Sequence, residues 1–437
     1  MAPYGYLKAE DVEFMVTDTA DIQKVTMKDD VPTGTIIIHK IGEVLTGVKE
    51  LSCGNIEFQY EKQTLSGVSF DIYAYEDIIR PDGSGEILLA KDELVGTITT
   101  NEEGIAIIDF LPVGKYYVVE KNTIDGFVLD DSPAVIDISY ADQNTNVVYC
   151  DKTIENMRQK VKVAVKKTDS KNNEPLASAI FGIYSSTDIS DADGILLVKA
   201  GELIESEKSD ENGLVTFMSD LPLGCYYVME ISAPAGYVKS DEVIEVDALK
   251  LSNDISAFEL EAEVTNDRIT IEFTKTDITG NHEIEGARLS IIDEFGNTVH
   301  SWTSAKETHI IEMLPAGKYI LREESAPYGY MIAEDVVFEV AETDEVQKVI
   351  MKDDTPNGKI IINKTDKHDG KPLAGVEFEI RNEAGEVIET LITDENGHAE
   401  SNILTAFTYI DGKYDRTCKY TVVETKTVEG YKLDNTE

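Results

Sequence analysis

The sequence predicts an all-β protein built from tandem β-sandwich domains in an elongated array. Three observations lead to this prediction: apolar and polar residues alternate with a period of two, the same motifs recur in order, and Gly, Asn and Asp turns bound each run. No segment sustains a helical period. Short alternating strands that are separated by frequent turns are typical of antiparallel sandwiches, in which one face of each sheet is apolar.

The longest repeat links the N-terminus to a later part of the chain. Residues 2–34 read APYGYLKAEDVEFMVTDTADIQKVTMKDDVPTG, and residues 326–358 read APYGYMIAEDVVFEVAETDEVQKVIMKDDTPNG. Roughly two-thirds of the aligned positions are identical without a gap, so the two segments are copies of one structural piece.

Shorter motifs divide the chain into repeating units. Each unit opens with a strand that ends in Lys, continues through a segment such as LSGVSFDIY, and passes an LPxGxY motif. A Glu then stands six residues before a Gly-aromatic pair, and a last strand closes the unit. The predicted pieces are the closing strands of a truncated domain at 1–33, complete domains at 34–158, 159–268 and 269–357, and a domain without its last strand at 358–437.

The composition excludes several classes of function. Lys and Arg supply 39 charges and Asp and Glu supply 84, which gives a net charge of −45. Binding to nucleic acid or to an anionic membrane needs clustered positive charge, so neither is expected. No apolar run approaches the length of a membrane span, and no signal peptide opens the chain. Cys53 and Cys150 fall in one unit and form either a disulfide or two buried thiols.

Strict alternation places charged residues on the core face of every unit, because residues i, i+2 and i+4 of a strand share a face. On the opening strand, the Lys follows two apolar residues on that face, and on the strand after LPxG the Glu does the same. On the closing strand, an Asn or Asp follows a core residue. The resulting triads are Lys40, Glu120 and Asn156; Lys167, Glu230 and Asn266; and Lys275, Glu323 and Asp353.

Burying such charges costs several kcal/mol unless they are paired, and an ion pair often barely compensates. A chemical reaction between the side chains removes the cost. A desolvated Lys loses its proton readily and becomes a nucleophile, while a carboxyl group in an apolar pocket keeps its proton. The amine then attacks the Asn or Asp carbonyl while the Glu polarises it and transfers protons. The product is a neutral amide, and ammonia or water leaves. The alternative is a buried, hydrogen-bonded ion cluster without a covalent bond.

The ordered set of motifs resembles the collagen-adhesin B-type (Cna B-type, SpaA-like) repeats of Gram-positive surface adhesins and pilins. The resemblance covers nearly the whole chain, because the Lys strand, TDENG, LPxGxYYVxE, APxGY and the closing Asn or Asp recur together. It implies a prealbumin-like, inverse-immunoglobulin (Ig-like) β-sandwich fold. It also implies Lys–Asn or Lys–Asp isopeptide bonds that a Glu helps to form, at the three triads given above.

Two positions depart from the pattern. Asp353 is followed by Asp354, so either residue is a possible acceptor, and alternation favours Asp353. The last unit holds Lys364 and Glu424 without an acceptor strand, whereas residues 1–33 hold a spare closing strand with Asp29. Either the two ends are cuts from a longer repeat array, or the N-terminal strand of one molecule completes the last unit of another, with Asp29 bonding Lys364.

The expected function is therefore a structural stalk of a cell-surface adhesin or pilus-like protein, extracellular and attached to the cell wall through an anchor outside this chain. The alternative is a binding module that recognises a host-matrix protein or glycan through loops at a sandwich end. No enzyme that turns over a substrate is expected, since no nucleophile, phosphate or metalloprotease motif is found. No cofactor or metal is expected either.

Overall fold

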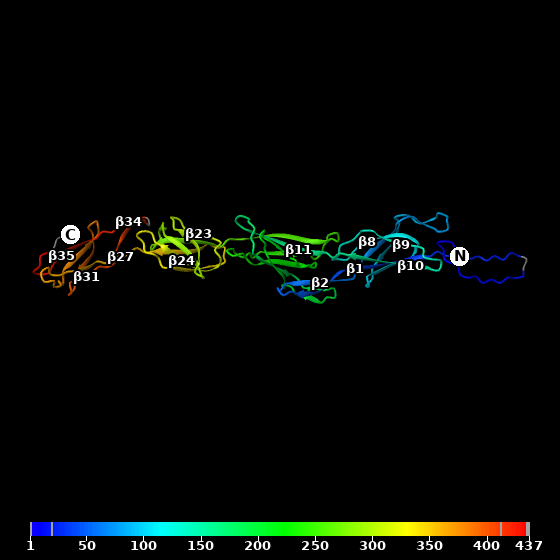
Figure 1. Ribbon diagram of the computed structural model, residues 1–437, viewed down its shortest axis with the longest axis horizontal. Coiled ribbons are helices and arrows are strands. Elements are labelled where there is room, and N and C mark those ends of the chain that lie inside the picture. The colour runs from blue at the N-terminus through cyan, green and yellow to red at the C-terminus, as the bar shows by residue number, and fades with distance from the viewer. Residues whose placement is uncertain (1, 19–20, 411–412, 434–437) are drawn as a thin grey trace. The chain divides into compact units, whose positions relative to one another are not determined.

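The structure is a computed structural model that describes residues 2–18, 21–410 and 413–433. Residue 1 and residues 434–437, the outer ends of the first and last predicted domains, lie outside the described residues. Every regular element in the described residues is a β-strand, which confirms the predicted all-β fold (Figure 1). None of the described segments forms a helix long and apolar enough to cross a membrane.

The chain divides into two compact units. The first contains Met1–Ala233 and Ser240–Thr265, and the second contains Pro234–Lys239 and Asn266–Glu437. Among the described residues, four hydrophobic clusters form the cores of four successive β-sandwiches. The sandwiches are numbered here in chain order.

The first sandwich packs a sheet of order β10-β1-β2, with β7 also paired to β1, against a sheet of order β6-β3-β8-β9. Its first and last strands lie side by side, because β1 pairs in parallel with β10. The strands are β1 (Thr33–Glu50), β2 (Ile56–Thr64), β3 (Ser69–Ala74), β4 (Ile78–Ile79), β5 (Ile87–Leu89), β6 (Leu94–Thr99), β7 (Ile105–Pro112), β8 (Gly114–Asn122), β9 (Ala134–Ile138) and β10 (Val147–Asn156).

The second sandwich repeats this plan with sheets of order β16-β11-β19 and β15-β12-β17-β18. Again the last strand, β19, neighbours the first strand, β11. The strands are β11 (Lys160–Asp169), β12 (Ile180–Ser185), β13 (Ile189–Ser190), β14 (Leu196–Val198), β15 (Leu203–Lys208), β16 (Leu214–Thr216), β17 (Cys225–Ser232), β18 (Val243–Asp247) and β19 (Ala257–Asn266).

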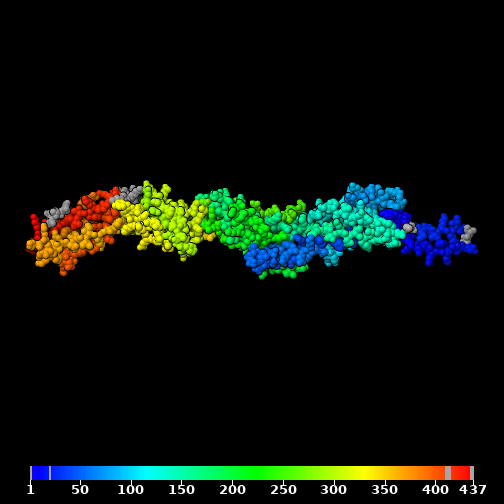
Figure 2. All heavy atoms as spheres, viewed as in Figure 1, coloured from blue at the N-terminus to red at the C-terminus, as the bar shows by residue number. Residues whose placement is uncertain are grey.

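A hairpin of the first sandwich covers part of the second (Figures 1 and 2). β1 continues beyond its own sandwich and returns as β2, and Phe58 of β2 belongs to the core cluster of the second sandwich. The Tyr60 hydroxyl donates to the carbonyl of Asp220 over 2.7 Å. The Arg158 guanidinium lies 3.7 Å from the centre of the Tyr60 ring and forms an ion pair with Asp220. The two sandwiches of this unit therefore share one packed interface.

The N-terminal segment, residues 2–32, contains no strand in its described part. It leaves the first sandwich and returns to it, and the Leu7 amide donates to the Asp30 carbonyl over 2.8 Å where the two runs meet (Figure 1). Gln23 donates its side-chain amide to the Thr17 carbonyl over 3.0 Å farther out. The segment is thus held as an open loop, with its residues 21–30 exposed.

The third sandwich, in the second compact unit, has sheets of order β23-β20-β26 and β22-β21-β24-β25. β20 pairs in parallel with β26, so the first and last strands are neighbours here too. The strands are β20 (Thr270–Asp277), β21 (Arg288–Asp293), β22 (Thr298–Thr303), β23 (His309–Glu312), β24 (Gly317–Ser325), β25 (Val336–Val340) and β26 (Gln347–Asp353).

The fourth sandwich is less extensively paired in its described residues. β28 pairs with β31, β27 pairs with β32, β33 pairs with β34, and a sheet of order β30-β29-β35 faces them. The strands are β27 (Asn357–Gly358), β28 (Ile361–Asn363), β29 (Glu377–Arg381), β30 (Val387–Ile392), β31 (His398–Glu400), β32 (Leu404–Thr405), β33 (Phe407–Ile410), β34 (Lys413–Thr417) and β35 (Thr421–Lys426).

The disulfide that the sequence left open between Cys53 and Cys150 is not formed. Both residues are free thiols. Cys53 lies exposed in the turn between β1 and β2, whereas Cys150 lies half-buried on β10, opposite Ile36 near the start of β1. Cys150 lies beside the start of β1 and Cys53 follows the end of β1, so the length of this strand separates the two residues.

Candidate functional site

The first sandwich gathers Lys40, Glu120 and Asn156 in its core. The three side chains come from β1, β8 and β10, and all three residues are buried, with Lys40 0% exposed. Lys40 Nζ donates to Glu120 Oε2 over 2.8 Å and also to Asn156 Oδ1. Asn156 Nδ2 donates in turn to Glu120 Oε1 over 2.5 Å. One carboxyl group therefore contacts both the amine and the side-chain amide that it faces.

The electrostatics of this cluster favour a reactive amine. Burial lowers the pKa of Lys40, and the hydrogen bond and charge of Glu120 oppose that shift. The carboxylate of Asp130 also acts on Lys40 and opposes the shift more weakly. A neutral amine beside an amide carbonyl, with a carboxyl group that contacts both, is the arrangement required for nucleophilic attack with proton transfer.

In the second sandwich, Lys167 and Glu230 are both buried, and Lys167 Nζ lies 4.0 Å from Glu230 Oε1. Glu230 Oε2 accepts a hydrogen bond from the backbone N–H of Ser240 over 2.7 Å. Asn266 is buried at the end of β19, the strand next to β11, and its Nδ2 donates to the Val238 carbonyl over 2.7 Å.

In the third sandwich, Lys275, Glu323 and Asp353 are brought together in the core. Lys275 Nζ donates to Asp353 Oδ1 and lies 3.2 Å from Glu323 Oε1. The neighbouring residue, Asp354, is half-buried, and its side chain accepts a hydrogen bond from the Thr355 amide over 2.7 Å. Of the two candidate acceptors, Asp353 is therefore the one that contacts the lysine.

Burial raises the pKa of the Asp353 carboxyl to about 7, although Lys275 opposes the shift. Because the folded pKa lies above the ordinary value, the carboxyl holds its proton up to about pH 7 and loses it above that. Only the protonated acid loses water when an amine attacks it.

This shift predicts how amide formation between Lys275 and Asp353 depends on pH. Chains solubilised from inclusion bodies in denaturant are refolded at several pH values, quenched in acid, digested and analysed for linked peptides by mass spectrometry. The rate should fall as the pH rises through about 7. The bond that is predicted between Lys40 and Asn156 is an internal control, because its acceptor does not ionise. A Lys275 bond that forms faster at higher pH contradicts the prediction.

In the described residues of the fourth sandwich, Lys364 and Glu424 form a pair. Lys364 Nζ donates to Glu424 Oε2 over 2.6 Å. The side chain of Lys364 is 24% exposed, compared with 2% for Lys275. Asp29, one of the two alternatives that the sequence leaves open for this lysine, lies exposed in the N-terminal segment.

Three contacts were not expected from the sequence. Thr123 Oγ1 accepts a hydrogen bond from Asn156 Nδ2 over 2.8 Å, and the backbone amides of Ser240 and Ala333 donate to Glu230 and Glu323. The Gly-aromatic motif is the signal for the two amides, because each lies four residues after a glycine of positive φ, namely Gly236 (88°) and Gly329 (95°). A side chain is disfavoured in that conformation, so glycine directs the chain back to the Glu.

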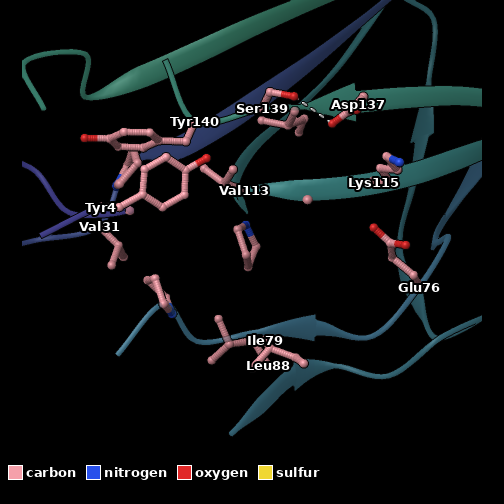
Figure 3. A pocket seen from close by; sticks show the side chains of 16 residues that line it. Tyr4, Val31, Glu76, Ile79, Leu88, Val113, Lys115, Asp137, Ser139 and Tyr140 are labelled. Carbon is pink, nitrogen blue, oxygen red and sulfur yellow. Dashed lines mark hydrogen bonds between the residues drawn. The ribbon is translucent and has the colours of Figure 1, made fainter. Parts of the chain in front are cut away.

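A pocket of about 280 Å³ lies apart from these clusters, between the N-terminal segment and the first sandwich (Figure 3). Tyr4 and Tyr140 meet there edge to face, with ring centres 4.9 Å apart. Ile79 and Leu88 line the opposite wall. No member of the three triads lines it. Within the described residues, no group of three His, Cys, Asp or Glu side chains is placed to hold a metal ion.

Comparison with known proteins gives the following matches. The model of the SpaA family, described as a prealbumin-like fold domain, matches residues 57–153, 161–261, 269–355 and 358–437. No curated protein matches the chain.

Among solved structures, the TIE protein of Bacillus anthracis is 23% identical, with a TM-score of 0.40; the match covers 92% of this chain and 71% of that protein. A streptococcal ancillary pilin is 18% identical, with a TM-score of 0.26 and coverage of 74% and 99%. BcpA, the major pilin subunit of Bacillus cereus, is 12% identical, with a TM-score of 0.35 and coverage of 74% and 100%. The four family-model matches together span most of the described residues, and the chain therefore belongs to the SpaA family of prealbumin-like fold domains.

Proposed function

We propose that this chain is the stalk of a Gram-positive cell-surface adhesin or pilus-like protein, and that intramolecular isopeptide bonds stabilise its sandwiches. The observation that carries the proposal is the buried cluster in which Glu120 contacts both Lys40 and Asn156. The membership of this chain in the SpaA family supports the structural role. Attachment to a cell wall is part of the proposal.

The proposed reaction in the first sandwich is a single intramolecular transfer. Lys40 loses a proton to Glu120, and its nitrogen attacks Cγ of Asn156. A new C–N bond forms while the bond from Cγ to Nδ2 breaks. Glu120 returns the proton to the departing nitrogen, to which it is already hydrogen-bonded, and ammonia leaves. In the third sandwich the acceptor is the Asp353 carboxyl, so that water leaves instead. The chemistry happens once per site and consumes no external substrate.

The position of the bond suits a protein under tension. β1 and β10 are parallel neighbours, so a force that pulls the N-terminal end of β1 away from the C-terminal end of β10 shears the hydrogen bonds between them. An amide between Lys40 and Asn156 takes that force through a covalent bond. The force then passes directly from Lys40 to Asn156, which lie 116 positions apart in the sequence. The part of the chain between them, which forms the sandwich, carries little load.

Intact mass tests the proposal directly. The purified chain should weigh less than its sequence by two ammonias and one water, because two acceptors are Asn and one is Asp. Replacing the Glu of one triad with Gln should restore the mass lost in that sandwich and leave the other two bonds in place. The three variants are Glu120→Gln, Glu230→Gln and Glu323→Gln. Glu102→Gln, at an exposed turn, is the control. A mass equal to the sequence mass refutes the proposal.

The expected partner of the stalk is a second copy of the chain, through Asp29 and Lys364, while a host-matrix protein or glycan would bind through domains outside this chain. The alternative function is a matrix-binding or glycan-binding module carried by the same sandwiches. The pocket beside Tyr4 and Tyr140 favours it, because two tyrosines offer a ligand both apolar ring surface and polar hydroxyl groups. Glycan arrays and immobilised matrix proteins distinguish the two functions.

A further inference from the structure

We propose that His300 and His309 bind a divalent transition-metal ion, Zn²⁺ or Cu²⁺, at one edge of the third sandwich. The two Nε2 atoms supply two ligands, and the remaining positions around the ion are open to water or to a group from another molecule. Neither histidine belongs to a reactive cluster, so this site goes beyond the proposed function and does not depend on it.

The two histidines lie where the chain crosses from one sheet of the sandwich to the other. His300 lies on β22, an outer strand of the sheet of order β22-β21-β24-β25, and His309 opens β23, an outer strand of the sheet of order β23-β20-β26. Residues 304–308 connect the two strands. Both histidines are half-buried, so each contacts the sandwich and also faces solvent, from which an ion can reach it.

The distance between the two rings fits a shared metal ion. His300 Nε2 and His309 Nε2 lie 3.2 Å apart and are hydrogen-bonded to each other. An ion about 2.0–2.1 Å from each nitrogen makes an angle of about 100–106° with the two, which is close to the tetrahedral geometry of Zn²⁺. After a small rotation of the rings, the ion replaces the Nε2 proton of the hydrogen bond. That proton moves to Nδ1 of the same ring or to water.

Trp302 holds one of the two ligands in place. Its indole stacks on the imidazole of His309, with ring centres 4.5 Å apart and ring planes 12° apart. Trp302 is itself packed against Phe273 of the core, with ring centres 5.3 Å apart. His300 stands two positions before Trp302 and therefore shares its face of β22. A ligand that is already ordered loses less conformational entropy when the ion binds.

The fold does not require a histidine at the position of His309. This residue pairs with Phe273, which stands two positions before the lysine of the triad. The residues at the corresponding position in the other three sandwiches are apolar and buried, and they are Ala106, Val215 and Ala399. A half-buried imidazole at this position therefore adds a polar group that the packing of a sandwich does not need.

The position of His300 is also occupied differently elsewhere. His300 pairs with Ile291. The corresponding residues of the other sandwiches are Gly96, Glu205 and Glu389. The carboxylate of Glu205 accepts hydrogen bonds from the backbone amides of Met218 and Ser219 over 2.9 and 2.7 Å. In the third sandwich, a pair of imidazoles takes the place of such a contact, and imidazole is a ligand that suits Zn²⁺ and Cu²⁺.

Fluorescence of Trp302 tests the inference, because Trp302 is the only tryptophan of the chain and contacts His309. The full chain is prepared without a histidine tag, and its four cysteines are alkylated because thiols also bind these ions. Excess Mg²⁺, which prefers oxygen ligands, occupies the carboxylates of a chain whose net charge is −45. Cu²⁺ should then quench the fluorescence saturably with one ion per chain, and Zn²⁺ should restore it by competition.

Two variants assign the quenching to the histidine pair. Loss of a group that only supports a metal ligand weakens binding about 10–100-fold, so loss of a ligand itself should weaken Cu²⁺ binding at least tenfold in His300→Gln and in His309→Ala. His309→Ala should fold, because alanine occupies this position in the first and fourth sandwiches. His282→Ala is the matched control, because His282 lies exposed between β20 and β21 of the same sandwich, and it should bind Cu²⁺ as the unmodified chain does.

Thermal unfolding gives a second measurement that does not depend on quenching. An ion that binds only the folded sandwich stabilises it as the ion concentration rises. Zn²⁺ should therefore raise the temperature at which the Trp302 emission shifts in the unmodified chain and in His282→Ala, but not in His309→Ala. Quenching that does not saturate overturns the inference, as does a His300→Gln or His309→Ala chain that binds Cu²⁺ with unchanged affinity. Either result leaves the proposed function standing.

Discussion

Replacing Glu120 with Gln should lower the unfolding free energy of the first sandwich by about 4–5 kcal/mol. A crosslink that closes a loop of about a hundred residues removes this much chain entropy from the unfolded state, by analogy with a disulfide. Lys40 and Asn156 are separated by 116 positions, which is close to that length. The variant also leaves a buried lysine without its carboxylate partner. A fall in melting temperature of roughly 10 °C or more is expected.

Non-additivity shows that the two residues act through one shared interaction, and the intact mass of each variant shows whether that interaction is covalent. Glu120→Gln and Asn156→Ala should each prevent the same proposed amide from forming, so the double variant should be only slightly less stable than either single variant. The exposed Glu102→Gln should change the melting temperature little. If Glu120→Gln has the same melting temperature as the unmodified chain, no crosslink of this kind stabilises the sandwich.

Replacing Phe58 with Ala should destabilise the second sandwich by about 3–5 kcal/mol, although Phe58 lies on a strand of the first. Phe58 is 5% exposed and belongs to the core cluster of the second sandwich. Truncation leaves a cavity that the rigid strands on either side cannot close. Because the hydrogen bond from the Tyr60 hydroxyl to the Asp220 carbonyl does not involve Phe58, the hairpin should remain docked, and the loss should appear as a weaker second core.

Hydrogen exchange read by mass spectrometry assigns that loss to a sandwich. Peptides from β11, β12 and β17 should exchange faster in Phe58→Ala, whereas peptides from β3 and β8 should be unchanged. Phe110→Ala is the matched control, because Phe110 is 82% exposed in the same compact unit. Equal exchange in the two variants contradicts the role of the hairpin in the second core.

The buried positions of the Lys and Glu residues could be predicted because strand alternation is a local property. Lys40 stands two and four positions after Ile38 and Ile36, and all three side chains are buried in one core. The same reasoning applies to Glu120, which follows Val118 and Tyr116. The repeats then grouped one Lys, one Glu and one acceptor in each complete unit, without any knowledge of how the strands pair.

Other features depended on contacts between distant residues. Thr123 stands three residues after Glu120, and the other complete units have no Thr at the matching position. Only the packing of β10 shows that Thr123 accepts a hydrogen bond from the Asn156 side-chain amide. The choice between Asp353 and Asp354 required the position of Lys275 Nζ. The separation of Cys53 from Cys150 required the full length of β1 and the turn at its far end.

The sequence by itself determined the β-sandwich class, the repeats and the face on which each charged residue lies, because all three follow from periodicity along the chain. Only the tertiary structure decided that the hairpin of β1 and β2 packs on the second sandwich and that Phe58 lies in the second core. The alternation around Phe58 predicts that one side of the strand will be buried, but every apolar surface satisfies that requirement equally. Shape and the local partners Tyr60, Arg158 and Asp220 select the surface.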